Sequence, residues 1–374
     1  MVPNLRFNND PYKKYNLYEF ATRVTRKNKD NVSNLPLTIS AQYGLVDQVS
    51  FFNKTVASKD MSGYYLLKNG EFAYNKSYSN DYPWGAIKRL DLYDMGCLST
   101  LYICFKTNDN IVNSNYLVHY FESSKWHKQV ADIAGEGARN HGLLNIVVND
   151  FFNTKHAVPT IENQIKIAGF LDLIEKRIQT QIKIIDDYNS LKMGIYNCMF
   201  KENYADYKLK QLAYIVKGDQ INNDQLLSNG SYYMMNGGTS PSGYIDSYNV
   251  SENTISISEG GNSCGYVQFN SSPFWSGGHC YTIQNVNSAL IENKYLYHYL
   301  KYKEKEIMNL RIGTGLPNIQ KKDLENFTIL VPSLLIQRKN LALFEMLDEK
   351  ISILNEELAN LQKQKKYLLC NMFI

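Results

Sequence analysis

The C-terminal part of the chain carries a repeating pattern of hydrophobic positions. From Phe344 to Leu368, apolar residues recur at every third or fourth position with charged residues between them, and Lys365 makes the single interruption. A narrow apolar seam with charged flanks predicts a long helix that packs along its length against another helix. The predicted seam positions are Phe344, Leu347, Ile351, Leu354, Leu358, Leu361 and Leu368.

The partner helix is predicted in the same chain, 173 positions earlier, where the seam returns and is again interrupted by a lysine, Lys192. The same register aligns Val158-Pro159 with Val331-Pro332 and Gln164 with Gln337, without a gap. We interpret this as the duplication of one large unit, because solenoid repeats have far shorter periods. The earlier seam positions are Leu171, Ile174, Ile178, Ile185, Tyr188 and Ile195.

The duplication divides the chain into four predicted segments. A first globule covers residues 1–157, a first long helix 158–203, a second globule 204–331 and a second long helix 332–374. In both globules, short runs of β-branched and aromatic residues alternate with turn residues, which is typical of strands.

Each globule is also predicted to contain a helix. In the first, Ser114 is placed to cap a helix that runs to about Lys128, because aromatic and apolar residues follow at helical spacing. In the second, similar spacing predicts a helix from about Glu292 to Leu310. Strands mixed with a few helices place the chain in the α+β class.

Connectivity predicts how the long helices meet. The ends of a compact domain usually lie close together, so the second helix should begin near the end of the first and run back along it. The expected architecture is two α/β domains separated by an antiparallel pair of long coiled-coil helices, with a pseudo-two-fold internal repeat. Two similar domains at a fixed separation suit DNA read at two half-sites, about 34–36 Å apart for one helical turn.

Several motifs carry a resemblance to a known family, and together they cover essentially the whole chain. They are Val2-Pro3-Asn4-Leu5-Arg6-Phe7 at the start, Gly315-Leu316-Pro317-Asn318 with Val331-Pro332 and Gln337 at the second junction, and Tyr367-Leu368-Leu369 with Met372-Phe373 at the end. In this order they resemble the specificity subunit of Type I restriction–modification enzymes. One departure is that the family's usual Glu-Gln at the junctions is Asn163-Gln164 and Ile336-Gln337 here.

The resemblance implies a division of labour. Each globule would be a target recognition domain, and the two would read a bipartite, asymmetric site on double-stranded DNA with an unspecified spacer. The long helices would set the spacer and dock two methyltransferase (M) subunits, and two ATP-driven restriction (R) subunits would complete the enzyme. The chain itself would be non-catalytic and would bind no cofactor, because S-adenosylmethionine, ATP and Mg²⁺ are expected on the partner subunits.

The bulk composition fits a folded, cytoplasmic protein. The chain is 44% hydrophobic and 20% charged, and its net charge of +4 permits an anionic partner without requiring one. Its 29 tyrosines suit a binding surface, although a tyrosine-biased composition would produce the same count. The six cysteines form no C-x-x-C pair, and we expect no secretion signal and no membrane span.

The sequence gives little indication of a catalytic, nucleotide-binding or metal-binding site in this chain. Asn9-Asp10-Pro11-Tyr12 resembles an amino-methyltransferase tetrapeptide, but it lacks the second proline and reads more simply as a turn. No phosphate-binding G-x-x-x-x-G-K-[ST] loop occurs. The adjacent His279 and Cys280 have no partner pair at metal-ligand spacing, so we predict no metal site and interpret them as strand packing.

Residue type and position in predicted turns indicate candidate DNA contacts in both globules. Lysine, arginine and backbone N–H groups grip phosphates, whereas polar and basic side chains read base edges. Glycine-rich loops let the backbone approach closely. The first-globule candidates are Lys54, Tyr74, Lys76, Lys88, Arg89 and Arg139, and the second-globule candidates are Thr239, Ser242, Tyr244, Asn262, Tyr266 and Arg311.

Two alternatives remain open at this stage. The chain could be the specificity half of a Type IIB-like enzyme, or a coiled-coil scaffold whose globules bind proteins. A steep salt dependence of DNA affinity would separate DNA readers from a protein scaffold, because phosphate neutralisation releases counterions.

Overall fold

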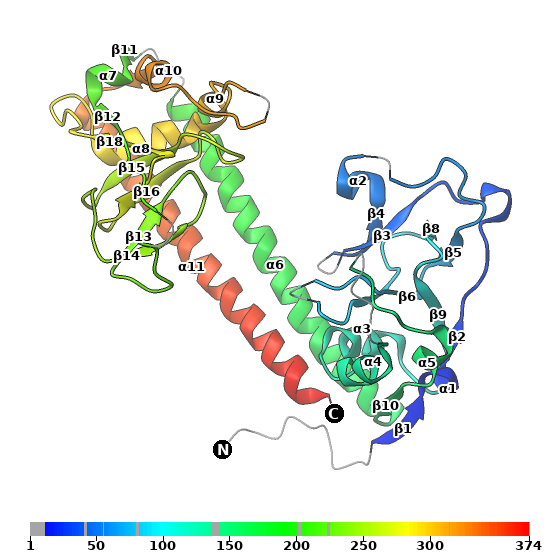
Figure 1. Ribbon diagram of the computed structural model, residues 1–374. Coiled ribbons are helices and arrows are strands. Elements are labelled where there is room, and N and C mark those ends of the chain that lie inside the picture. Colours follow the sequence, from blue (N-terminus) through cyan, green and yellow to red (C-terminus); the bar gives the residue numbers. More distant parts are fainter. Residues whose placement is uncertain are drawn as a thin grey trace. The chain divides into compact units, whose positions relative to one another are not determined.

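A computed structural model describes residues 12–40, 43–54, 56–79, 82–135, 142–200, 204–222, 225–313 and 315–373 (Figure 1). Its contacts divide the chain into two compact units. The first unit comprises residues 1–181 and 357–374, and the second comprises residues 182–356. Each long helix therefore contributes one part to each unit. The four segment boundaries drawn from the sequence stay a prediction.

The first globule is built on a four-stranded antiparallel sheet. The strands of the whole first globule are β1 (Lys13–Asn16), β2 (Ala21–Arg23), β3 (Leu37–Ser40), β4 (Gly44–Asp47), β5 (Tyr65–Lys68), β6 (Phe72–Asn75), β7 (Ala86–Arg89), β8 (Met95–Leu98), β9 (Ile103–Thr107) and β10 (Lys155–Val158). The main sheet has the order β2-β9-β6-β7, and β1 pairs with β10, β3 with β4, and β5 with β8. Its helices are η1 (Lys29–Asn31), α1 (Leu17–Phe20), α2 (Gln48–Phe52), α3 (Ser114–Glu122), α4 (His127–Ile133) and α5 (Val148–Phe152).

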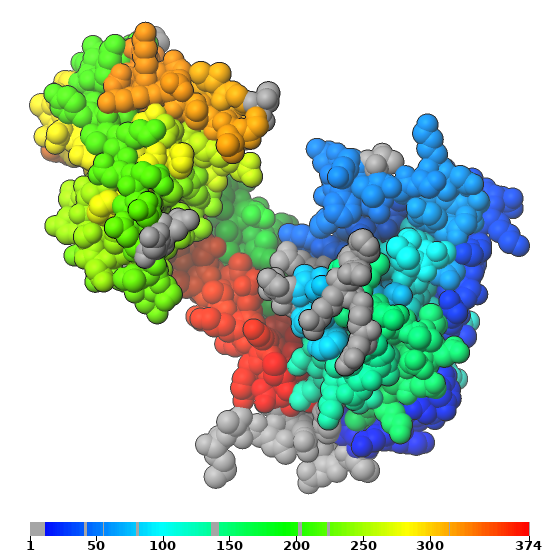
Figure 2. Space-filling view, in the orientation of Figure 1, coloured from blue at the N-terminus to red at the C-terminus, as the bar shows by residue number. Residues whose placement is uncertain are grey.

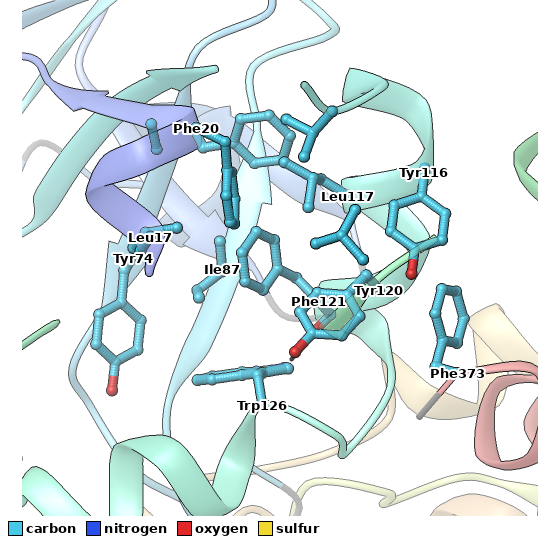
Figure 3. Packing of buried hydrophobic residues seen from close by; sticks show 14 of the residues in the cluster. Leu17, Phe20, Tyr74, Ile87, Tyr116, Leu117, Tyr120, Phe121, Trp126 and Phe373 are labelled. Carbon is cyan, nitrogen blue, oxygen red and sulfur yellow. Dashed lines mark hydrogen bonds between the residues drawn. The ribbon is translucent and has the colours of Figure 1, made fainter. Parts of the chain in front are cut away.

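An aromatic cluster fills the core between this sheet and its helices. Tyr116 and Tyr120 of α3 point toward Phe373, near the C-terminus of the chain (Figure 3). The Phe373 ring lies 5.4 Å from the Tyr116 ring and 5.8 Å from the Tyr120 ring, measured between centroids. Such tilted and edge-to-face pairs add to the free energy gained by burying the rings. The last residues of the chain are thereby part of the first globule's core.

The second globule repeats this plan with different additions. Its strands are β11 (Ala205–Lys208), β12 (Tyr214–Lys217), β13 (Tyr232–Met235), β14 (Gly243–Ile245), β15 (Thr254–Ser258), β16 (Val267–Asn270), β17 (Trp275–Ser276), β18 (Cys280–Gln284) and β19 (Thr328–Val331). Its helices are α7 (Leu209–Leu212), α8 (Asn293–Tyr302), α9 (Glu304–Met308) and α10 (Lys321–Glu325). The main sheet has the order β12-β18-β15-β16, a second sheet has the order β14-β13-β17, and β11 pairs with β19.

The two globules share a frame and differ in what is inserted into it. The orders β2-β9-β6-β7 and β12-β18-β15-β16 correspond strand for strand in chain order. Between the first and second strands of the frame along the chain, the first globule inserts β3, β4 and β5, whereas the second inserts β13 and β14. The predicted duplication is therefore confirmed in the scaffold, and the insertions distinguish the two copies.

The two long helices, α6 (Ile161–Met199) and α11 (Leu334–Met372), have 39 residues each. In the first unit, Gln181 of α6 donates to Glu357 of α11 at 3.0 Å, and Glu175 accepts from Lys365 at 2.7 Å. As the position in α6 falls, the position in α11 rises, so the helices run antiparallel. In the second unit, Tyr196 packs against Phe344, with ring centroids 4.8 Å apart, in the same sense. Figure 1 shows the two helices side by side.

The predicted seam is the contact surface of this helix pair. Each of the thirteen predicted seam positions is buried or half-buried, and Leu171 and Phe344 are fully buried. The antiparallel coiled-coil interpretation of the periodicity is confirmed.

The interruption of the seam by lysine has a structural reason in both copies. Lys365 pairs with Glu175 in the first unit, and Lys192 pairs with Asp348 in the second. Asp348 occupies in α11 the position that Glu175 occupies in α6, so the two ion pairs are reciprocal. Each copy of the duplicated unit therefore keeps an equivalent ion pair. The apolar seam can accommodate a lysine because the methylene stem of lysine packs against apolar surface while its ammonium reaches a carboxylate.

The start of each long helix is tied to its globule by an equivalent glutamine. Gln164 accepts from the N–H of Asn113 at 2.7 Å and donates to Ile111 O at 3.2 Å and Pro159 O at 2.8 Å. Gln337, which is also fully buried, makes three hydrogen bonds of the same kind to its own globule.

Two predicted helices are shorter than expected. The cap of α3 is Asn113, whose side chain accepts from Tyr116 N at 3.1 Å, so the choice of Ser114 is wrong by one residue. The helix ends at Glu122, because the side chains of Ser123 and Trp126 bond the carbonyls of its last turn, and a separate helix, α4, follows. Likewise the helix predicted at about 292–310 is divided into α8 and α9.

Within the described parts of the chain, none of the helices combines the length and apolar character needed to cross a lipid bilayer.

Candidate nucleic-acid interface

The three glycine-rich stretches of the second globule meet at one surface. They are residues 236–242 after β13, 259–266 after β15 and 277–279 before β18, and we call them the glycine-loop surface. The N–H of His279 donates to Asn236 Oδ1 at 3.0 Å, and the N–H of Glu259 donates to His279 O at 2.9 Å. Ser258 Oγ donates to Gly237 O at 2.7 Å. The pairing of β15 with β18 and of β13 with β17 brings these loops together.

Glycine is required at two places on this surface. Gly237 has a φ of +81°, and a Cβ there would lie 3.1 Å from His279 Cβ. At Gly277 a Cβ would come within 2.6 Å of Asn236 Oδ1. A side chain at either position would push the loops apart, since L residues rarely adopt positive φ and the second gap is closed to a methyl group.

Glu259 lies beneath the loops and joins several of them. Its Oε1 accepts from Lys217 Nζ at 2.6 Å and from Tyr281 OH at 3.1 Å, and its backbone carbonyl accepts from Ile319 N at 2.8 Å. Burial, and then the carboxylate of Glu259, raise the pKa of Tyr281, so this hydroxyl stays a donor at neutral pH. The Lys217 ammonium offsets the negative charge of Glu259 at this surface.

Most second-globule candidates lie on or beside the glycine-loop surface. Thr239, Ser242 and Asn262 are exposed on its loops. Arg311 is exposed on a neighbouring segment, in which Ile312 bridges to Asn318, and Asn318 in turn bridges to Gly260.

The two tyrosine candidates differ in exposure. Tyr244 lies on β14 and is exposed, whereas Tyr266 is half-buried with Lys301 Nζ 4.1 Å from its ring centroid. Part of the Tyr266 ring is therefore committed to a contact inside the globule.

The first-globule candidates come from separate places and include one correction. Tyr74 is fully buried, stacks on Phe151 with centroids 5.0 Å apart and donates from its hydroxyl to Trp84 O at 2.8 Å. A side chain without exposed surface offers no contact to DNA, so Tyr74 is a core residue. Lys54 is exposed after α2, and Lys76 is half-buried after β6.

The remaining basic candidates of the first globule are partly occupied. Lys88 pairs with Glu122 at 2.7 Å, and Arg89 Nε pairs with Asp91 Oδ1 at 2.6 Å. Arg89 also donates to Ser114 Oγ at 2.8 Å, so both side chains already hold β7 against its surroundings. Arg139 lies outside the described residues.

Sequence reasoning missed His279, Glu259 and Lys217. His279 was interpreted as strand packing, which is wrong, because its side chain is 64% exposed. The available signal was its place directly after Gly277-Gly278, a context that favours a loop over a strand. Nothing local marks Glu259 or Lys217, because their pairing depends on the meeting of β12, β15 and β18.

The second globule matches a known family model. Residues 201–363 match the Type I restriction modification DNA specificity domain. This match contains the glycine-loop surface and the first thirty residues of α11.

Two curated relatives share part of the chain. A protein provisionally named as a type I specificity subunit of Mycoplasma pneumoniae is 34% identical over 155 residues, which are 41% of this chain and 41% of the relative. A similarly named protein of Mycoplasma genitalium is 32% identical over 127 residues, which are 34% of this chain and 33% of the relative. The matched segments thus span about two-fifths and one-third of these relatives.

A solved structure shares the whole fold. The crystal structure of a Type-I restriction-modification system S subunit from M. genitalium covers 100% of this chain and 99% of its own, with a TM-score of 0.61 and 18% sequence identity. At that identity the likeness speaks for the fold alone. Residues 201–363 therefore carry a Type I restriction modification DNA specificity domain, and the chain is similar in sequence and in fold to type I specificity subunits.

Proposed function

We propose that this chain is the DNA-reading and assembly subunit of a type I restriction–modification enzyme. Each globule is a target recognition domain, and the two together read a bipartite, asymmetric sequence with an unspecified spacer. The observation that carries this proposal is a shared strand frame with unlike insertions. Two copies of one scaffold with different loops suit two different half-sites.

The chemistry of the glycine-loop surface supports DNA as the ligand of the second globule. Its exposed side chains are hydroxyls, amides and an imidazole, which can donate to and accept from base edges. Its glycines allow backbone N–H groups to approach phosphates. Lys217 and Arg311 add positive charge beside these loops.

The helix pair supports a docking role for two M subunits. In the first unit, α6 and α11 form a shallow apolar groove lined by Phe170, Ile174, Lys363, Gln364, Tyr367 and Leu368. The C-terminal part of α11, red in Figure 2, is visible at the surface. Exposed apolar side chains such as Phe170 and Tyr367, contiguous on one face, favour a protein partner there.

The remaining tasks belong to partners in this proposal. The M subunits bind S-adenosylmethionine, and two R subunits bind ATP and Mg²⁺ and cut the DNA, while this chain contributes no catalytic group. Each long helix would span about 58 Å at roughly 1.5 Å per residue, which gives the pair length enough to set the spacer. The complex would act in the cytoplasm, where its DNA substrate is.

Co-expression with the M subunit from the same genome tests the proposal. We expect the two to co-elute in gel filtration as a complex that methylates DNA, and methylome sequencing of the host should show one bipartite motif. The isolated chain should neither methylate nor cut. Separate elution, or a methylome without a bipartite motif, would contradict the assignment.

A further inference from the structure

His279 is anchored through its backbone, while its imidazole faces solvent. Asn236 accepts from its N–H, and its carbonyl accepts from the N–H of Glu259. These two bonds fix the backbone of His279 where its loop meets the loops at 236–242 and 259–266. With the backbone held, rotation about the side-chain bonds of His279 determines which groups its ring contacts.

One buried carboxylate oxygen lies close to this ring. Glu259 uses Oε1 for Lys217 and Tyr281, whereas its buried Oε2 has no hydrogen-bond partner among the described residues. His279 Nδ1 is 3.7 Å from Oε2, beyond a hydrogen bond but within reach of a small torsional change. A buried carboxylate oxygen without a donor is costly, which favours closing this gap.

We propose that His279 reads a base of the half-site bound by the second globule, and that Glu259 is its positioning residue. The inference rests on the proposed function, because it requires DNA at the glycine-loop surface. When the ring donates Nδ1–H to Glu259 Oε2, Nε2 becomes an outward-facing acceptor. In the major groove, that acceptor matches the amino groups at N6 of adenine and N4 of cytosine.

The neighbours of His279 fit this role. Gly237 leaves room beside the Cβ atom of His279, because a Cβ at position 237 would lie only 3.1 Å from it. Thr239 and Asn262 are exposed on the two flanking loops and can contact adjacent groups on the DNA. Lys217, held by Glu259, keeps the local charge from repelling phosphates.

Base analogues test the contact directly in the assembled methyltransferase complex. Once methylome sequencing has defined the motif, duplexes would carry purine in place of one adenine, or 2-pyrimidinone in place of one cytosine, at each position in turn. At one position in one half-site, loss of the amino group should weaken binding by the wild-type complex roughly three- to tenfold. The complex with His279→Ala should show no penalty at that position and unchanged penalties elsewhere.

Two further variants separate positioning from mere folding. Glu259→Gln should reduce the penalty at the same position, because the amide no longer presents a charged acceptor to Nδ1–H. Tyr214→Ala removes an exposed side chain at the opposite end of β12 from Lys217, and it should leave every penalty as in the wild type. Thermal unfolding of each variant complex checks that the fold is retained.

The outcomes distinguish the inference from the proposed function. Identical analogue penalties in wild type and His279→Ala would overturn the role of His279 while the bipartite motif still stands. A full penalty retained in Glu259→Gln would remove Glu259 as the positioning residue. A wild-type complex without sequence preference would overturn the proposed function and this inference together.

Discussion

Lys365 of α11 donates a hydrogen bond of 2.7 Å to Glu175 of α6, at the one place where the apolar seam of α11 is broken. The same ammonium lies 3.1 Å from Glu122 of α3, so it joins both long helices to the first globule. Burial alone would lower the pKa of Lys365, but Glu122 and Glu175 outweigh burial and raise it. The lysine is therefore charged at neutral pH.

Replacing this lysine with an apolar residue should destabilise the chain. In Lys365→Met the seam becomes continuous, but Glu122 and Glu175 lose their shared partner inside a partly buried site. We expect a loss of about 1–2 kcal/mol in the free energy of unfolding, discounted for the remaining exposure of these groups. Urea unfolding measures it, with Lys366→Met at an exposed neighbouring position as the control. A variant as stable as the wild type would show that the apolar gain offsets the lost ion pairs.

The acid side of the stability curve should depend on Glu122. Burial would raise the pKa of Glu122, but Lys88 and Lys365 outweigh it and lower the pKa from 4.5 to about 2. Because the folded-state pKa is the lower one, the stabilisation is complete above pH 4.5 and is lost as pH falls toward 2. Glu122→Gln should be less stable than wild type at pH 6 and should lose less stability between pH 4.5 and 3. Parallel curves over that interval would refute the linkage.

A second pH dependence should come from His156. It is buried between Tyr120 OH at 2.9 Å and Thr154 Oγ1 at 2.8 Å, and burial lowers its pKa from 6.5 to about 4. The unfolded chain takes up a proton near pH 6.5 and the folded chain resists it, so stability falls as pH drops from 6.5 to 4. His156→Gln should flatten this part of the curve. The decline should persist in part, because burial and two nearby lysines lower the pKa of His298 to about 3.

The two buried glutamines offer a matched comparison within one chain. Gln164→Ala and Gln337→Ala each remove three hydrogen bonds and leave backbone groups unpaired, which should cost roughly 2–4 kcal/mol in each unit. Hydrogen exchange can follow the two units separately, and each variant should loosen mainly its own globule. A large difference in cost between the two variants would count against their structural equivalence.

Salt dependence should reveal whether Arg311 grips the DNA backbone. If its guanidinium neutralises one phosphate, Arg311→Ala should reduce the slope of log affinity against log salt by about 0.9 and weaken all sequences alike. Lys350→Ala, at an exposed position of α11, is the control and should leave the slope unchanged. An unchanged slope for Arg311→Ala would exclude a phosphate contact.

The long helices were predictable because their signal is local. A seam repeats every three or four residues, and the same 39 positions are helical in both copies, from Ile161 and from Leu334. The break after Glu122 was not predictable from periodicity, since it depends on Ser123 and Trp126 turning back to bond the last carbonyls.

The candidate site was predictable only in part. Glycine-rich stretches indicated loops, and Thr239, Ser242 and Asn262 are indeed exposed on them. Tyr74 was predicted to contact DNA and is buried, whereas His279 was predicted to pack in a strand and is exposed. Residue type and neighbours do not determine exposure in a short strand or loop. Tyr74 stacks on Phe151 and donates a hydrogen bond to Trp84 O, whereas the side chain of His279 is exposed on a loop.

By itself, the amino-acid sequence determined that the chain is duplicated and that two long helices pair along an apolar seam. The reason is that the residues buried in a helix pair recur at regular intervals along each helix. Only the tertiary structure decided which residues far apart in the chain meet. Lys365 reaches Glu175, and Glu259 approaches His279, because strand pairing and helix packing bring separate segments together, and no local pattern encodes those encounters.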